Sequence, residues 1–129
     1  MARIHFIYST MNAGKSTALL QTNFGYLEKG MNTLLYTSEK DNRYGDSEIV
    51  SRIGLKSKAE TFKDSDNLFD CVSKAHKKNA IDCVLIDEAQ FLTKDQVYQF
   101  GRVVDELDVT VIAYGIRTDF RGELFEGSR

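Results

Sequence analysis

Apolar residues occur in short runs along the 129-residue chain, and polar, charged or glycine-containing stretches separate these runs. Short apolar runs bounded by polar loops are typical of strands buried in a sheet. The pattern predicts strands at residues 3–8, 33–37, 83–86 and 109–114. Between them, apolar residues recur at helical spacing, and this periodicity predicts helices at residues 15–29, 67–78 and from residue 94 to about 107.

The expected ends of these helices carry residues that commonly start or stop a helix. Gly30 is well placed to end the first helix. Ser65 or Asp66 can cap the second, and Thr93 with Gln96 has the spacing of a capping box for the third. Because strands and helices alternate, we expect one α/β domain over residues 1–129, with a parallel sheet covered by helices on both faces.

The segment at residues 39–58 is polar, charged and glycine-containing. We expect it to be a mobile loop with at most a short helix, since long loops inside a compact domain are usually functional or disordered. The formal net charge of −2 and the pI near 5.7 provide no basic surface for nucleic acid. They do not exclude small anionic ligands, which need only local positive groups.

Cys71 and Cys83 are expected to be free, buried thiols, because they lie on a predicted helix and a predicted strand. His5 and His76 have no metal-ligand neighbours in sequence and are expected to be structural.

No apolar run approaches membrane-spanning length, and the short N-terminal segment before the first loop does not match a signal peptide. We therefore expect a cytoplasmic protein with no membrane partner.

A candidate phosphate loop lies at residues 9–16, between the first strand and the first helix. The pattern G-x-x-x-x-G-K-[ST] is matched at Gly14, Lys15 and Ser16 but not at Ser9. Gly14 allows backbone N–H groups to approach phosphate, and Lys15 supplies a positive charge to the β- and γ-phosphates. The Ser16 hydroxyl can bind magnesium.

Two carboxylates, Asp87 and Glu88, follow the predicted strand at residues 83–86. P-loop enzymes need an acid at this point to support the magnesium ion, and Asp87 suits that role. A neighbouring carboxylate can accept a proton from an attacking hydroxyl, which suits Glu88. The string DEAQ at residues 87–90 also resembles the DExx motif of helicases, so a nucleic-acid-dependent ATPase is an alternative. The short chain, its negative charge and the lack of interleaved aromatic and basic residues count against that alternative.

Five strings in order carry a closer resemblance: YSTMNAGKST at 8–17, YTSEKDNRYG at 36–45, SRIGL at 51–55, VLIDEAQFL at 84–92 and YGIRTDFRGELFEGS at 114–128. Together they extend over nearly the whole chain, and the DEAQF and GIRTDFRGELF strings are the most specific. The chain resembles the zinc-lasso (type II) thymidine kinases, and bacterial members share the departure at Ser9. The resemblance implies a P-loop NTPase (RecA-like) fold, a parallel sheet flanked by helices.

The resemblance also implies transfer of the ATP γ-phosphoryl group to the 5′-hydroxyl of thymidine or deoxyuridine. Glu88 would be the base, Arg43 would stabilise the transferred phosphoryl group, and Ser16 and Asp87 would hold Mg²⁺. The residues implied in ATP binding are Ser9, Met11, Asn12, Ala13, Gly14, Lys15, Ser16, Thr17, Asp87 and Gln90. Those implied in the thymine pocket are Met11, Phe91, Ile116 and Phe120, although from the residues alone Phe91 and Phe120 would be assigned to the core. Arg52, Arg117 and Arg121 are expected at the surface or in salt bridges.

Family members continue into a small zinc domain with a lasso loop, which would lie beyond Arg129, so we expect a chain truncated before that domain. Cys71 and Cys83 do not form a CxxC pair, and zinc is not expected within these residues. Without a lid over the nucleoside, weak or absent turnover is expected. A non-catalytic ATP-binding remnant is therefore a further alternative. The resemblance also implies a homotetramer.

Overall fold

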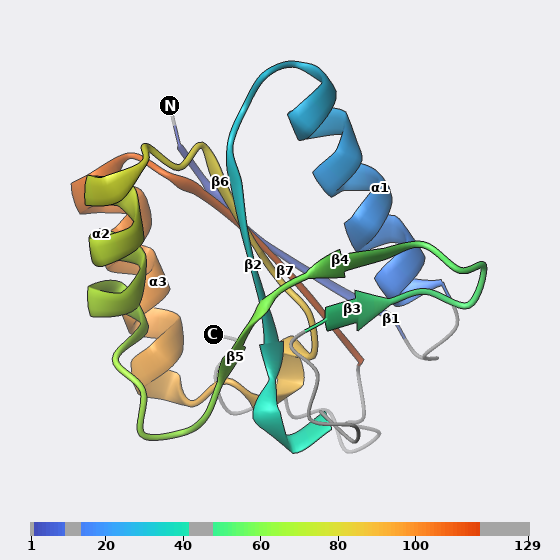
Figure 1. Ribbon diagram of the computed structural model, residues 1–129. Coiled ribbons are helices and arrows are strands. Elements are labelled where there is room, and N and C mark those ends of the chain that lie inside the picture. Colours follow the sequence, from blue (N-terminus) through green and yellow to red (C-terminus); the bar gives the residue numbers. More distant parts are fainter. Residues whose placement is uncertain (1, 10–13, 42–47, 117–129) are drawn as a thin grey trace.

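The computed structural model describes residues 2–9, 14–41 and 48–116. Its main sheet has five parallel strands in the order β1–β7–β6–β2–β5 (Figure 1). The strands are β1 (Ile4–Ser9), β2 (Thr33–Ser38), β5 (Glu60–Phe62), β6 (Cys83–Ile86) and β7 (Thr110–Ile116). The predicted parallel sheet is confirmed, and all its strands run in one direction, so their carboxyl ends meet at one edge.

Helices cover both faces of this sheet, as predicted. Helix α1 (Lys15–Glu28) lies on one face, whereas α2 (Leu68–Lys78) and α3 (Lys94–Leu107) lie side by side on the other (Figure 1). Strand β6 alternates between the two faces: Leu85 packs into the cluster under α1, and Ile86 packs into the cluster under α2 and α3. A strand buried on both faces needs apolar residues at every position, which explains the uninterrupted run in β6.

Two of the predicted helix ends are confirmed, and one predicted helix cap is wrong. Gly30 has a φ of +78°, which favours glycine, and its N–H bonds to the last turn of α1. The capping box of Thr93 and Gln96 is present at the start of α3. Helix α2, however, is capped by Asn67, whose side chain accepts the Asp70 N–H at 3.1 Å. The predicted cap Asp66 instead accepts the Lys63 N–H, so its carboxylate stabilises the preceding turn.

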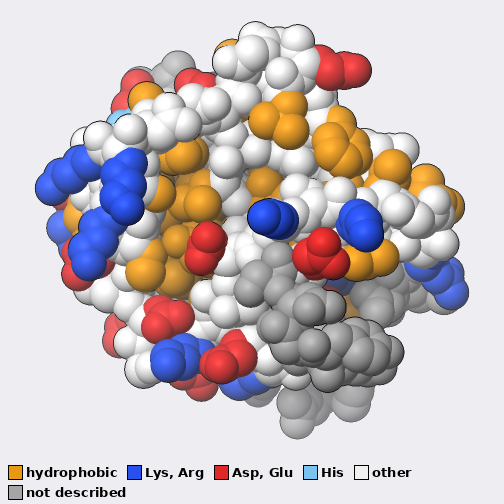
Figure 2. Space-filling model, viewed as in Figure 1, with side chains coloured by type: hydrophobic (Ala, Val, Ile, Leu, Met, Phe, Trp, Pro, Cys, Tyr) orange, Lys and Arg blue, Asp and Glu red, His pale blue; other side chains and the backbone are white. Residues whose placement is uncertain are grey.

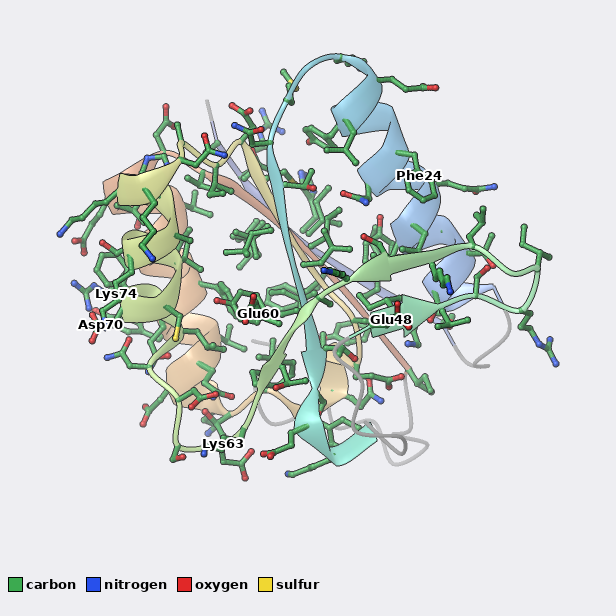
Figure 3. The ribbon with its side chains drawn as sticks, in the orientation of Figure 1. Phe24, Glu48, Glu60, Lys63, Asp70 and Lys74 are labelled. Carbon is green, nitrogen blue, oxygen red and sulfur yellow. The ribbon has the colours of Figure 1, made fainter. Side chains whose placement is uncertain are left out.

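The prediction of a mobile loop over residues 39–58 was wrong for the part that the structure describes. A short 3₁₀ helix, η1 (Glu39–Asp41), follows β2, and an antiparallel hairpin forms from β3 (Glu48–Val50) and β4 (Lys56–Lys58). The hairpin is anchored by Ile49, which is buried in the cluster under α1. Strand β5 then joins the main sheet, with Glu60 near the hairpin and Lys63 just beyond the strand (Figure 3).

Lys and Arg side chains gather over α2, where Asp70 and Lys74 lie on the solvent side (Figures 2 and 3).

Cys83 is buried and free as predicted, but Cys71 is free and exposed, since it lies on the outer part of α2. The structural role of His76 is confirmed, because its Nδ1 accepts the Ile81 N–H at 3.0 Å. His5 lies exposed on β1. Within the described residues, no helix is both long and apolar enough to span a bilayer.

Candidate active site

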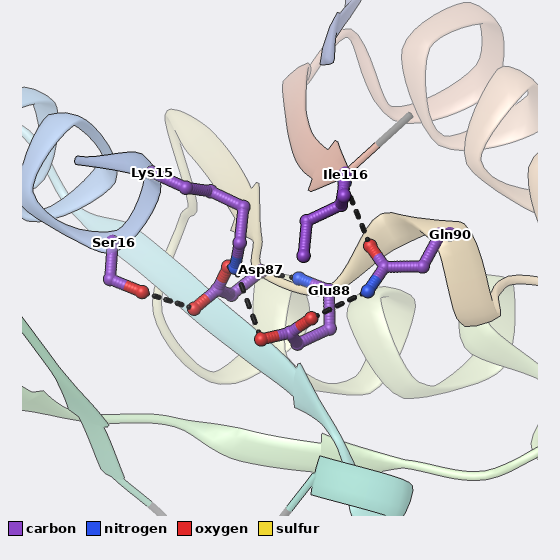
Figure 4. Close-up of polar contacts among 6 residues, drawn as sticks. All are labelled: Lys15, Ser16, Asp87, Glu88, Gln90 and Ile116. Carbon is purple, nitrogen blue, oxygen red and sulfur yellow. Dashed lines mark hydrogen bonds and ion pairs between the residues drawn. The ribbon is translucent and has the colours of Figure 1, made fainter. Parts of the chain in front are cut away.

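Two residues of the predicted phosphate loop, Lys15 and Ser16, meet the predicted acids Asp87 and Glu88 at the carboxyl edge of the sheet (Figure 4). Strand β7 lies between β1 and β6, so the carboxyl ends of β1 and β6 flank the end of β7. Ser9, the last residue of β1, pairs with Ile116, the last residue of β7. In parallel α/β sheets, ligands bind in the crevice outside the carboxyl ends of the strands.

Helix α1 begins directly at this edge. Gly14 is its N-cap, with a φ of +82° that glycine adopts without strain. Among the described residues, no side chain caps the first turn of α1, and that turn holds no acidic residue. The first N–H groups of a helix carry partial positive charge, so this end of α1 is suited to a phosphate group.

Lys15, in the first turn of α1, forms ion pairs with both predicted acids. Its ammonium contacts Asp87 Oδ1 and lies 3.1 Å from Glu88 Oε2. All three residues are buried, with exposed fractions of 5%, 4% and 6%. Burial disfavours the charged ammonium, but the Asp87 and Glu88 carboxylates outweigh that effect and raise the pKa of Lys15. At neutral pH, Lys15 therefore carries a positive charge and contacts both acids.

Ser16 and Asp87 provide oxygen atoms that fit a magnesium site. The Ser16 hydroxyl donates to Asp87 Oδ2 at 3.0 Å, beside the Lys15 ammonium. Magnesium prefers hard oxygen ligands and usually keeps several water molecules, so one hydroxyl and one carboxylate are a sufficient protein contribution when a nucleotide supplies phosphate oxygens. Ser16 and Asp87 therefore offer, in contact with each other, the types of oxygen ligand that magnesium prefers.

Glu88 has a left-handed backbone, with φ of 58° and ψ of 42°, which is uncommon for a residue other than glycine. Its N–H donates to Asp87 Oδ1 at 2.9 Å, and its carbonyl accepts the Phe91 N–H at 3.1 Å. These bonds start the short 3₁₀ helix η2 (Ala89–Phe91). The sharp change of direction after β6 places the Glu88 carboxylate beside Lys15 rather than on the outer surface.

Gln90 connects the acid pair to the end of β7 (Figure 4). Its Nε2 donates to Glu88 Oε1 at 2.6 Å, and its Oε1 accepts the Ile116 N–H at 3.1 Å. The sequence analysis missed Gly115, on which this packing depends. A Cβ on Gly115 would lie 2.9 Å from Tyr8 Cε1 and 3.1 Å from Gln90 Oε1. The available signal was a glycine directly after the predicted strand at residues 109–114; β7 in fact continues to Ile116, and a glycine in a strand often marks the close approach of another backbone.

The remaining predicted site residues that the structure describes lie in α1, at the end of β7, in η2 and on the surface. Thr17 lies half-buried in α1, and Ile116 ends β7 beside Gln90. Phe91 is partly buried against the core, and the Lys40 ammonium lies 5.4 Å from its ring centroid. Arg52 is exposed, as expected for a surface residue. The following predicted residues lie outside the described residues: Met11, Asn12, Ala13, Arg43, Arg117, Phe120 and Arg121.

A family profile and individual protein sequences, compared with this chain, both indicate the same family. The profile of the family described as thymidine kinase matches residues 2–129. The thymidine kinase of Escherichia coli (strain K12) is 56% identical over 129 residues, which cover 100% of this chain and 63% of that protein. The thymidine kinase of Shewanella oneidensis is 53% identical over 128 residues, covering 99% of this chain and 67% of that protein. The chain thus spans 63% of the length of the first of these relatives.

Proposed function

The chain belongs to the thymidine kinase family, and on this basis we propose that it transfers the γ-phosphoryl group of ATP to the 5′-hydroxyl of thymidine or deoxyuridine. The observation that carries the proposal is the contact of Lys15 with both Asp87 and Glu88 at the start of α1. It unites a phosphate-binding cation, a metal-supporting acid and a second acid in one buried cluster. Phosphoryl transfer depends on this combination of positioning and charge stabilisation.

The nucleotide would bind at the N-terminus of α1. Gly14 leaves space for phosphate near the first N–H groups of α1, and Lys15 provides a full positive charge. Ser16 and Asp87 would hold Mg²⁺, which when bound offsets the negative charge of the phosphate oxygens. Binding requires the Lys15 ammonium to exchange its contacts with the two acids for contacts with phosphate. The buried acids favour that exchange only if another cation takes the place of Lys15, so nucleotide and metal are expected to bind together.

Glu88 is the proposed base that accepts the proton of the 5′-hydroxyl. One of its oxygens contacts Lys15 and the other contacts Gln90, so the carboxylate is held in a fixed orientation. A base must lie within hydrogen-bond reach of the proton that it removes, and a fixed carboxylate meets that demand without further ordering. Arg43 is proposed to stabilise charge on the transferred group.

The nucleoside is proposed to bind beside Phe91 and Ile116, together with Met11 and Phe120. An apolar, partly aromatic pocket suits a methylated pyrimidine ring. Phe91 directly follows Gln90 in η2, which is compatible with a base bound next to the acid pair.

The chain is proposed to supply the nucleotide-binding part of the enzyme. A cytoplasmic location and a homotetramer remain predictions. Size-exclusion chromatography with light scattering tests the homotetramer.

The test is an assay for thymidine monophosphate with magnesium ATP and thymidine, in which the chain is compared with its Lys15→Met variant. Lys29→Met is the matched control, because Lys29 is an exposed lysine just after the same helix. In line with the weak turnover expected from the sequence, we expect product at a low and similar rate with the unchanged chain and with Lys29→Met, and none with Lys15→Met. Binding of ATP and thymidine is measured by calorimetry in parallel. Failure to bind thymidine, or ATP hydrolysis stimulated by DNA instead of thymidine, would contradict the proposal.

A further inference from the structure

We propose that Gln90 is a positioning residue, which orients the Glu88 carboxylate and couples that orientation to the end of β7. The inference deepens the proposed function and rests on it, since it gives Gln90 a task other than binding the nucleotide. Three observations carry it: the two hydrogen bonds of the Gln90 amide, the fixed backbone of η2 and the space left by Gly115.

The two hydrogen bonds together determine how the Gln90 amide is turned. A backbone N–H can only donate, so the group facing Ile116 is the carbonyl oxygen of the amide. An ionised carboxylate can only accept, so the group facing Glu88 is the NH₂. The amide is planar, and a change in position at one end therefore moves the other. The side chain acts as a rigid connection between the Ile116 backbone and the Glu88 carboxylate.

The backbone of Gln90 is itself fixed. It lies in η2, whose ends are closed by the Phe91 N–H to the Glu88 carbonyl and by the Leu92 N–H to the Ala89 carbonyl, both at 3.1 Å. Ala89 is buried in the core beneath α2 and α3. On the other side, the Gln90 N atom would lie 3.1 Å from a Cβ on Gly115, so strand β7 packs directly against this residue. A functional group held by such contacts loses little entropy when the substrate binds.

The Gln90 contact also differs from the Lys15 contact in what happens to it during nucleotide binding. Lys15 holds Glu88 Oε2, and it is the group proposed to move to phosphate. Gln90 holds the other oxygen, Oε1, and its own anchor is the β7 backbone. The Gln90 bond can therefore persist when Lys15 moves, which keeps Glu88 oriented toward the bound nucleoside.

Kinetics separate a positioning role from nucleotide binding. We expect Gln90→Met to lower kcat by about tenfold or more while the KM for ATP changes little, because misplacement of a reacting group affects the transition state. The isosteric Gln90→Glu keeps the shape but replaces the donor by a carboxylate, and we expect at least the same loss. Gln99→Met is the control: Gln99, in α3, accepts the Leu68 N–H at the start of α2 at 2.7 Å, so its loss should leave kcat unchanged. A raised KM for ATP with unchanged kcat in the Gln90 variants would overturn the inference.

A measurement independent of turnover is the backbone amide resonance of Ile116 in the ¹⁵N-labelled chain. If Gln90 couples the two sites, Glu88→Ala shifts this resonance in the chain with Gln90, and the shift disappears in the Gln90→Met background. An equal shift in both backgrounds would overturn the inference. The spectrum answers the question even when no thymidine monophosphate forms. A chain with coupled resonances but no product would contradict the proposed function alone, whereas product without coupling would contradict only the role of Gln90.

Discussion

The Lys15 ammonium lies 3.1 Å from Oε2 of Glu88, although the two residues are 73 positions apart in the chain. The contact exists because β1 and β6 are parallel and lie on either side of β7, so the start of α1 and the residues after β6 meet at one edge of the sheet. It joins a helix N-terminus to an acid on a strained turn, and it is buried. The free energy of folding and the proposed binding of phosphate therefore depend on the same ammonium group.

Replacement of Lys15 by methionine is expected to destabilise the fold as well as abolish nucleotide binding. Asp87 and Glu88 would remain buried next to each other without their cation. Removing one partner of a buried ion pair typically costs about 3 to 5 kcal/mol. Urea unfolding at neutral pH measures this cost, with exposed Lys29→Met as the control. A loss below about 1 kcal/mol would mean that the carboxylates find other partners or protonate at small cost.

Gly115→Ala is expected to destabilise the chain by about 1 to 3 kcal/mol, because the new methyl group would overlap Tyr8 and the Gln90 side chain in a packed region. Gly101→Ala is the matched control. It lies within α3, where an added Cβ would meet no described atom within 4 Å, so alanine should stabilise the helix by about 0.5 to 1 kcal/mol. Thermal or urea unfolding measures the change in stability of each variant, and we expect the two changes to have opposite signs. Equal effects of the two substitutions would contradict the close packing at Gly115.

Ile49→Ala tests the hairpin of β3 and β4. Ile49 has an exposed fraction of 2% and packs into the cluster under α1, so its truncation should cost about 2 kcal/mol or more. The neighbouring Val50 has an exposed fraction of 56%, and Val50→Ala should change the stability by at most about 0.5 kcal/mol. Urea unfolding compares the two variants. Similar small effects would indicate that the hairpin does not pack against α1 in solution.

The buried thiol of Cys83 should make the fold sensitive to alkaline pH. Burial raises the pKa of Cys83 from its usual 9.0 to about 11, so the folded chain keeps this proton at pH values where the unfolded chain loses it. The contribution is fully present below pH 9 and is lost as pH rises through 11, by about 3 kcal/mol in total. The measurement is the unfolding free energy between pH 8 and 11 for the chain and for Cys83→Ala. Parallel pH profiles for the two proteins would contradict the expected burial of the thiol.

Much of the fold could be predicted from the sequence, because the principal strands and helices have strong local signals. The apolar run of β6 and the capping box at Thr93 each specify one element without tertiary information. The hairpin and β5 could not be predicted, since each strand has three residues and the hairpin is held mainly by Ile49 against a distant helix. Asn67 became the cap of α2 because Asp66 bonds to Lys63, and such competition depends on the turn geometry.

For the candidate site, the meeting of Lys15 with the two acids could be predicted, because both follow strands of a parallel sheet. The hydrogen bond between Gln90 and Ile116 could not be predicted. It depends on the order of the strands, which places the end of β7 beside η2, and on the absence of a side chain at Gly115. Motif spacing indicates the candidate reacting groups, whereas the groups proposed to orient them follow from packing between elements.

The left-handed backbone of Glu88 has a consequence for protein engineering. An L-residue in this conformation costs about 1 to 2 kcal/mol relative to its usual state, and glycine avoids most of that cost. Glycine would relieve that backbone cost, but it would also remove the buried contacts of the Glu88 carboxylate with Lys15 and Gln90. Design rules that place glycine at every left-handed position should therefore not be applied here, because the change would also remove the proposed base.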